Sequence, residues 1–321
     1  MQAIIPLAGK GTRVRPHTHS RAKPLLRVAN RPVLSYIIEQ LRAEGVDEVI
    51  AVTGHLGGQV EQWLRAQFPN LLVRVVPQAE QRGTADAIAV AEPWVTGPSF
   101  IAFADTLFDA DFSAVRRFRG ADAIFWTRET DDWSSFGVAV ADAGGRIRRL
   151  VEKPTELVSR LVTIGLFLVS DHRLMFEGVH DVLSRPPNRG EYYLTDAFQY
   201  MIDQGADIRT APARGWHDCG TVGGLLDTNR IMLDRGHGIL RQDGPPLVAL
   251  AEGVETSGSR MGPYVSVAEN TRVRGSRLQN TIVGSDCVIE DCDLRDSVIG
   301  DHVKLRGVSG TTNIGDHGEV S

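Results

Sequence analysis

Residues 3–13, AIIPLAGKGTR, decide how the fold of this 321-residue chain begins. Five apolar residues lead directly into two glycines that flank Lys10, and Arg13 follows two positions later. A short apolar run that ends in glycines is typical of a buried strand followed by a tight turn. The N–H groups of such a turn can bind a phosphate, although strand-to-helix turns also use glycines for packing alone. We therefore interpret residues 3–7 as a strand and 7–13 as a candidate phosphate-binding loop.

Short apolar runs alternate with helical patterns from residue 1 to about 110. The predicted strands cover residues 3–7, 48–53, 71–76 and 99–104. Apolar residues three or four positions apart predict helices in the regions 33–41, 60–64 and 85–89. This alternation favours a Rossmann-like α/β fold with a mostly parallel, buried sheet. Ligands of such sheets bind beyond the carboxyl ends of the strands.

The middle of the chain has a less regular pattern. Strands predicted at 121–127, 136–141, 146–151 and 161–169 favour a partly antiparallel extension of the sheet. Helices are predicted over 193–204 and 222–235. Residues 237–246 are rich in Gly and Pro, and we interpret them as a linker. The chain is thereby predicted to contain one domain over residues 1–236 and a second over residues 247–321.

Aliphatic residues recur at intervals of six in the second domain. These residues are Val267 and Val273, then Ile282, Val288 and Leu294, then Ile299 and Leu305. The phase slips between 273 and 282 and again between 294 and 299. An inward-pointing hexad repeat predicts a short left-handed parallel β-helix, with one hexad on each side of a triangular coil. A small antiparallel β-appendage is the alternative.

Composition excludes several classes of function. A net charge of −5 gives no general attraction to nucleic acid or to an anionic membrane, so any phosphate site must be local. The sequence contains no run of about 18 apolar residues that would span a membrane. Its three cysteines form no CxxC pair, and the apolar opening lacks the basic region of a secretory leader. We therefore expect a reduced, cytoplasmic protein with no nucleic-acid or membrane partner.

The residues after the first strand match neither common nucleotide motif. The third glycine of a dinucleotide-binding fold and the GxxxxGK[ST] spacing of a P-loop are both absent. Lys23, held by Pro24 ten residues after Arg13, would supply a second cation to one polyphosphate. Lys-Pro on its own is also common in surface turns.

Two further stretches carry side chains suited to a nucleotide. Gln78 and Gly83 lie before a predicted helix, and a Gln amide offers a donor and an acceptor that match the edge of a pyrimidine. Asp105 follows a predicted strand and Asp218 precedes a predicted helix, so that the two carboxylates could hold Mg²⁺ against substrate phosphates. Each aspartate could instead be a turn or cap residue, with Asp218 capping the following helix.

The combined pattern resembles the sugar-1-phosphate nucleotidyltransferases. GxGTR at 9–13, then Pro16 and Thr18, KPL at 23–25 and NRP at 30–32 match the amino-terminal signature of that family. The resemblance continues to about residue 235, and the hexad tail is similar to that of long-tailed glucose-1-phosphate thymidylyltransferases. It implies an enzyme that joins a nucleoside triphosphate to a sugar 1-phosphate and releases pyrophosphate, with Mg²⁺ as cofactor.

The resemblance also implies roles for individual residues. Members that use dTTP or UTP carry a similar Gln and Gly, so one of these nucleotides is expected, with glucose 1-phosphate as the acceptor. The sequence departs from the family at Ala104, usually Gly, and at Thr163-Ile164, where many relatives have an Asn. The implied site comprises Arg13, Lys23 and Lys153 for catalysis; Leu7, Ala8, Gly9, Gly11, Thr12, Gln78, Gly83 and Thr84 for the nucleotide; Gly137, Glu152, Gly165 and Glu191 for the sugar; and Asp105 and Asp218 for the metal.

Two other functions remain open on the sequence. The chain could be a catalytically silent regulatory subunit that senses nucleotide-sugars, although Arg13, Lys23, Asp105, Lys153 and Asp218 are retained. The tail could instead be an acyltransferase, although its only histidines are His302 and His317. We expect the tail to have a structural role in a homo-oligomer.

Overall fold

The computed structural model describes residues 1–238 and 247–321. Most of the predicted linker, residues 239–246, lies outside the described residues. The chain forms two compact units. The first contains residues 1–9 and 37–216, and the second contains residues 10–36 and 217–321. The 10–36 segment, which carries most of the amino-terminal signature, therefore belongs to the same unit as the tail, residues 247–321.

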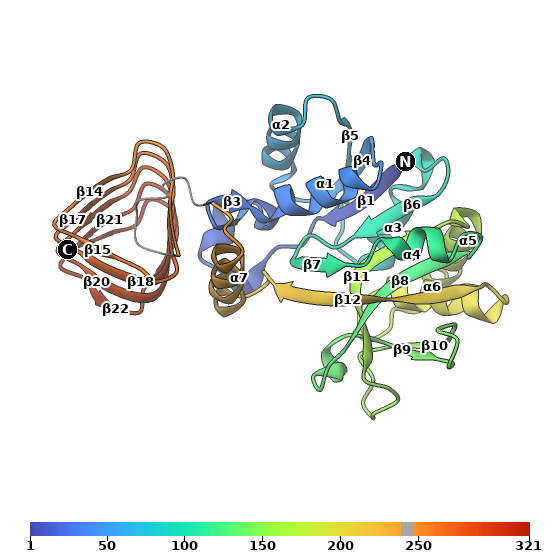
Figure 1. Ribbon diagram of the computed structural model, residues 1–321. Coiled ribbons are helices and arrows are strands. Elements are labelled where there is room, and N and C mark those ends of the chain that lie inside the picture. The colour runs from blue at the N-terminus through green and yellow to red at the C-terminus, as the bar shows by residue number, and fades with distance from the viewer. Residues whose placement is uncertain (239–246) are drawn as a thin grey trace. The chain divides into compact units, whose positions relative to one another are not determined.

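A ten-stranded mixed sheet forms the centre of the first unit (Figure 1). Its strands are β1 (Gln2–Leu7), β4 (Glu48–Thr53), β5 (Leu72–Pro77), β6 (Ser99–Ala102), β7 (Thr106–Ala110), β8 (Ala123–Glu129), β9 (Gly137–Ala141), β10 (Ile147–Glu152), β11 (Leu161–Val169) and β12 (Ile208–Asp218). The main path runs β5-β4-β1-β6-β11-β8-β12-β7, and β9 pairs with β10 and β11.

The direction of pairing changes along this sheet. β1 is parallel to β4 and β6, and β4 is parallel to β5. β11 is antiparallel to β6, β8 and β9, and β9 is antiparallel to β10. This confirms a parallel, buried first half with an antiparallel extension. The strands predicted between residues 3 and 104 are confirmed within two residues.

Helices of the first unit pack buried apolar side chains against the sheet. The α-helices of the described residues are α1 (Val33–Ala43), α2 (Gly57–Gln67), α3 (Thr84–Ala89), α4 (Ser113–Arg117), α5 (His172–Leu183), α6 (Leu194–Asp203) and, in the second unit, α7 (Val222–Asp234). Ile88 of α3, Phe176 of α5 and Phe198 of α6 share one buried cluster with Phe125 and Phe167 of the sheet. Burial of large apolar side chains of this kind contributes roughly 1.5–3 kcal/mol each. No described helix is long and apolar enough to cross a membrane.

The sequence analysis missed two long elements of the first unit, α5 and β12. α5 has its N-cap at Asp171, whose carboxylate accepts a hydrogen bond from Leu174 N at 3.0 Å, and this cap was a usable signal. β12 contains Pro212, and a proline argues against a strand interior because it cannot donate to the ladder. Pro212 is nevertheless the last residue of β12 that pairs with β8, so few ladder bonds are lost.

The tail consists of short strands that pair only in parallel among the described residues. Successive coils advance by about sixteen residues, since Val265 pairs with Thr281 and Thr281 with Ser297. This arrangement is consistent with a β-helix, and the antiparallel alternative is wrong. The strands are β13 (Val248–Leu250), β14 (Glu255–Ser257), β15 (Arg260–Met261), β16 (Val265–Val267), β17 (Arg272–Arg274), β18 (Arg277–Val283), β19 (Val288–Glu290), β20 (Asp293–Ile299), β21 (Lys304–Arg306), β22 (Ser309–Gly310), β23 (Asn313–Ile314) and β24 (Glu319–Val320).

The sixteen-residue coil also corrects the hexad prediction. Three full hexads would need eighteen residues, so the aliphatic pattern must slip in each coil. Val283 and Ile289 occupy the core of the tail, where Ile282 and Val288 were predicted to point. Ile282 is buried but faces outward, beside Leu26 and Leu225 of the same unit, and Val288 is half-buried.

Candidate active site

The loop after β1 requires glycine at position 11. Gly11 has a φ of +60°, and a Cβ there would lie 2.8 Å from Thr18 Cγ2. Thr18 Oγ1 donates a hydrogen bond to Gly11 O at 2.8 Å, which closes the loop. The spacing between Gly11 and Thr18 in the signature therefore has a steric origin. On the first-unit side of the loop, Ala8 O accepts a hydrogen bond from Gln81 Nε2.

Arg13, Lys23 and Asp218 converge on Gly220 in the second unit. A Cβ placed on Gly220 would lie 2.9 Å from Asp218 Oδ1, 3.1 Å from Arg13 Nη2 and 3.3 Å from Lys23 Nζ. Two cations thus stand beside one carboxylate, and this leaves a net positive corner that suits a polyphosphate. The sequence analysis did not single out Gly220. The run DCGT at 218–221, just before a helix, was a signal that this glycine lies where a side chain would not fit.

Asp218 does not cap the helix that follows it. The N-cap of α7 is Thr221, whose Oγ1 accepts a hydrogen bond from Gly224 N at 3.0 Å. Asp218 accepts one hydrogen bond on each oxygen, from Gly220 N and from Thr221 Oγ1, both at 2.8 Å. Its carboxylate is therefore fixed in place, while each oxygen retains a second lone pair for another ligand.

Asp105 lies in the turn between β6 and β7 of the first unit, at the carboxyl end of a buried strand. It is half-buried, and its Oδ1 is 3.4 Å from Thr106 Oγ1. Among residues 1–238 and 247–321, no group of three or more His, Cys, Asp or Glu side chains is arranged so that it could hold a metal ion. Asp105 and Asp218 belong to different units, so their joint binding of one ion stays a prediction. Mg²⁺ characteristically takes one or two carboxylates and leaves its other positions to water and phosphate, a donor set that these residues fit.

The candidate base site is built around Gln78, which is buried. Its Nε2 donates to Asp86 Oδ2 at 2.7 Å, and Arg82 Nη2 lies 2.6 Å from Asp86 Oδ1. Because an ionised carboxylate only accepts hydrogen bonds, Asp86 determines which end of the Gln78 amide turns away from it. Gly83 has a φ of +133°, and a Cβ there would lie 2.4 Å from Tyr192 O, so only glycine fits.

Thr84 has a structural contact in this region. Its Oγ1 accepts a hydrogen bond from Leu194 N at 2.9 Å and so connects the start of α3 to the start of α6. The sequence analysis missed Asp86, although its position on α3, one helical turn after Arg82, is typical of an ion pair.

Polar side chains also gather around Gly137 in the first unit. A Cβ on Gly137 would lie 3.0 Å from Thr195 Oγ1 and 3.1 Å from both Glu152 Oε2 and Thr163 Oγ1. Thr195 Oγ1 donates to Glu152 Oε2 at 2.7 Å. Burial raises the pKa of Glu152, while the hydrogen bond from Thr195 and the charge of Lys153 oppose the rise. The sequence analysis did not identify Thr195.

The remaining predicted sugar residues differ in their surroundings. Lys153 has a φ of +42°, and its Nζ lies 4.0 Å from Glu152 Oε1 and 4.9 Å from the centre of the Tyr193 ring. Gly165 has a φ of +78° and packs against Phe103, where a Cβ would lie 2.8 Å from a ring carbon. Glu191 is exposed, and its backbone N–H donates to Asn188 O at 3.0 Å.

Trp216 adds a polar group that sequence reasoning missed. Its ring packs edge-on against Phe136, with the ring centres 4.5 Å apart. Its Nε1 is buried and has no hydrogen-bond partner among the described residues. Buried donors in proteins are nearly always paired, so a ligand is a natural partner for this one.

The chain was compared with known proteins. Residues 2–235 match the model of the nucleotidyl transferase family. A glucose-1-phosphate thymidylyltransferase of Streptomyces griseus is 34% identical, with 96% of this chain and 88% of the relative covered. One of Streptomyces antibioticus is 31% identical, with 100% and 99% covered. A crystal structure of UDP-glucose pyrophosphorylase with UDP-glucose has a TM-score of 0.65 at 21% identity and covers 73% of this chain and 98% of its own. The chain therefore belongs to the nucleotidyl transferase family.

Proposed function

We propose that this enzyme transfers a nucleotidyl group from dTTP or UTP to a sugar 1-phosphate, preferably glucose 1-phosphate, and releases pyrophosphate. The observation that carries the proposal is the convergence of Arg13, Lys23 and Asp218 on Gly220. The activity of the two Streptomyces relatives, which match nearly the whole chain, supports the choice of substrates.

The reaction needs alignment and charge compensation more than a protein nucleophile. A phosphate oxygen of the sugar 1-phosphate attacks the α-phosphorus, and the bond from the α-phosphorus to the bridging oxygen breaks. Arg13 and Lys23 would take up the negative charge that develops on the departing pyrophosphate. Mg²⁺ held by Asp105 and Asp218 would further screen the charges of the phosphates. Lys153 would orient the attacking phosphate, and such positioning contributes roughly 7–11 kcal/mol.

Base selection would depend on Gln78. Its Nε2 is held by Asp86, so the Oε1 acceptor is the end left for a ligand. Thymine and uracil carry an N3–H donor that this acceptor would bind, whereas cytosine has an unprotonated N3 that it would repel. Gly83 would hold the base-binding turn against the backbone of Tyr192, because a Cβ there would lie 2.4 Å from Tyr192 O.

The sugar would lie beside Gly137. Glu152, Thr163 and Thr195 would bind its hydroxyl groups, and the buried Nε1 of Trp216 would donate one further hydrogen bond.

We also infer the handedness of the tail, the domain boundaries and the assembly. The near-hexad spacing of the aliphatic residues supports a left-handed β-helix over residues 247–321. The proposed domains remain residues 1–236 and 247–321, and the proposed assembly is a homo-oligomer.

A pyrophosphate-release screen tests the proposed function. Five nucleoside triphosphates are crossed with several sugar 1-phosphates in the presence of Mg²⁺. We expect the highest kcat/KM with dTTP or UTP and glucose 1-phosphate, and loss of base preference in Gln78→Ala. A preference for GTP or ATP would contradict the base assignment, and no pyrophosphate release with any pair would contradict the function.

A further inference from the structure

The 10–36 segment is unusually basic. It contains seven Lys or Arg residues and no Asp or Glu. Mutual repulsion among these cations opposes any single arrangement of the segment. Arg13 and Lys23 are the two that stand beside Asp218, so the other cations need compensation from elsewhere.

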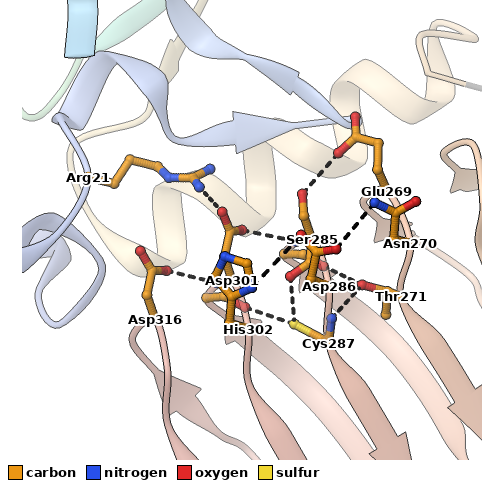
Figure 2. A network of polar contacts seen from close by, with 12 residues as sticks. Arg21, Glu269, Asn270, Thr271, Ser285, Asp286, Cys287, Asp301, His302 and Asp316 are labelled. Carbon is orange, nitrogen blue, oxygen red and sulfur yellow. Dashed lines mark hydrogen bonds and ion pairs between the residues drawn. The ribbon is translucent and has the colours of Figure 1, made fainter.

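The tail presents a ladder of acceptors at one corner of its coils (Figure 2). Ser285 Oγ donates to Glu269 Oε2 at 2.9 Å, and Ser285 N donates to Asp301 Oδ1 at 3.0 Å, each across sixteen residues. Asp301 N donates to Asp316 Oδ1 at 2.8 Å. Neighbouring coils thus hold each other's side chains, and the carboxylates of the ladder are fixed before anything binds them.

This ladder, consisting of Glu269, Ser285, Asp301 and Asp316, contacts the 10–36 segment directly. Arg21 forms an ion pair with Asp301, whose side chain is only 12% exposed, and Arg27 forms one with Glu269. Arg27 Nη1 also lies 3.3 Å from Ser285 Oγ. Ser20 Oγ donates to Asp316 Oδ2 at 2.7 Å.

The two arginines bracket the lysine of the active site. The 3-10 turn of residues Lys23–Leu25 lies between Arg21 and Arg27, and Leu26 N donates to Lys23 O at 3.1 Å. With both ends attached to the tail, a turn this short has little freedom to shift. The partly buried ion pairs also neutralise two of the seven cations, so repulsion on Lys23 is reduced.

We propose that Asp301 and Glu269 are positioning residues for nucleotidyl transfer, acting through Arg21 and Arg27 to hold Lys23 in the triphosphate site. The tail therefore contributes to catalysis from within the same chain, beyond any structural role in assembly. This inference depends on the proposed function, because it assumes that Lys23 binds the triphosphate.

The test compares two ladder variants with two matched controls in the full-length enzyme. The variants are Asp301→Asn and Glu269→Gln. The first control is Asp286→Asn, which changes an aspartate that follows Ser285 but whose side chain contacts Asn270 and His302 of the tail. Glu290→Gln changes a tail carboxylate that pairs with Arg306. For each protein, kcat and both KM values are measured below its melting temperature.

We expect both ladder variants to lose roughly tenfold to a hundredfold in kcat/KM for the nucleoside triphosphate, the scale of a small misplacement of a catalytic group. KM for the sugar 1-phosphate should stay unchanged, and both controls should match the wild type. Should Asp301→Asn not fold, Arg21→Gln removes the same ion pair from the other side. Ladder variants that behave like the controls would overturn the inference while wild-type turnover stands, whereas absent wild-type turnover would overturn the proposed function.

Discussion

Asp86→Asn should weaken the preference of the enzyme for dTTP over CTP. The carboxylate of Asp86 accepts the hydrogen bond from Gln78 Nε2 at 2.7 Å, which leaves Oε1 as the acceptor for the base under the proposed function. An asparagine at this position offers both a donor and an acceptor, so the amide of Gln78 can turn over and present its NH₂ group instead. That orientation suits the unprotonated N3 of cytosine.

The size of the effect follows from the lost contact. A hydrogen bond to a charged group contributes about 1.5–3 kcal/mol net. If this whole free energy determines the orientation of the Gln78 amide, the ratio of kcat/KM for dTTP to kcat/KM for CTP falls by roughly 10- to 150-fold in Asp86→Asn. The ion pair of Asp86 with Arg82 adds little, because Arg82 is exposed. Steady-state pyrophosphate release with each nucleotide, at saturating glucose 1-phosphate, measures the ratio.

A second Gln–Asp pair supplies the control. Gln199 Nε2 donates to Asp203 Oδ1 at 2.7 Å on an exposed part of α6, so Asp203→Asn removes the same kind of contact away from the base site. The control should keep the wild-type ratio. An unchanged ratio in a folded Asp86→Asn enzyme would refute the assignment of Gln78 orientation to Asp86.

Three further predictions concern metal, pH and thiols. Asp218→Asn should abolish Mg²⁺-dependent turnover, because the neutral amide keeps the shape of the side chain but not its charge. Urea unfolding should show a change of less than about 1 kcal/mol in the free energy of unfolding. Full activity of the variant in excess EDTA would contradict the prediction. Burial holds the pKa of His17 below its ordinary value of 6.5, against the hydrogen bond that its Nε2 donates to Asn313 Oδ1 and the charge of Asp316. The unfolded chain therefore binds this proton first, and the free energy of unfolding should fall as pH drops below 6.5, a loss that is smaller in His17→Gln. All three cysteines are buried, and burial raises the pKa of Cys287 to about 11, so the native protein should react slowly with a thiol reagent and the urea-unfolded protein quickly.

Local patterns were sufficient for much of the first unit. The strand boundaries of β4 and β11 match the sequence predictions, because long runs of Val, Ile and Leu have few alternatives to a buried strand. β12 was missed because Pro212 is a local signal against a strand, and pairing with β8 overrides it. The hexad pattern predicted the parallel coils of the tail but not their length. Hexads and sixteen-residue coils produce similar spacings of aliphatic residues over short distances.

The candidate site divides in the same way. Arg13, Lys23 and Asp218 were predicted from their motifs, and the structure brings them together around Gly220. Thr195 was not predicted, because its contact with Glu152 joins residues 43 positions apart and has no periodic signature.

The family signature and the alternation of strands and helices follow from the amino-acid sequence alone. These depend on backbone conformation and on burial patterns that repeat within a few residues, so they can be read locally. Two contacts exist only in the folded chain: Gln78 Nε2 donates a hydrogen bond to Asp86, and Arg21 pairs with Asp301 of the tail, 280 residues away. Such contacts depend on which surfaces the folded chain brings together, and the spacing of residues along the sequence carries no record of them.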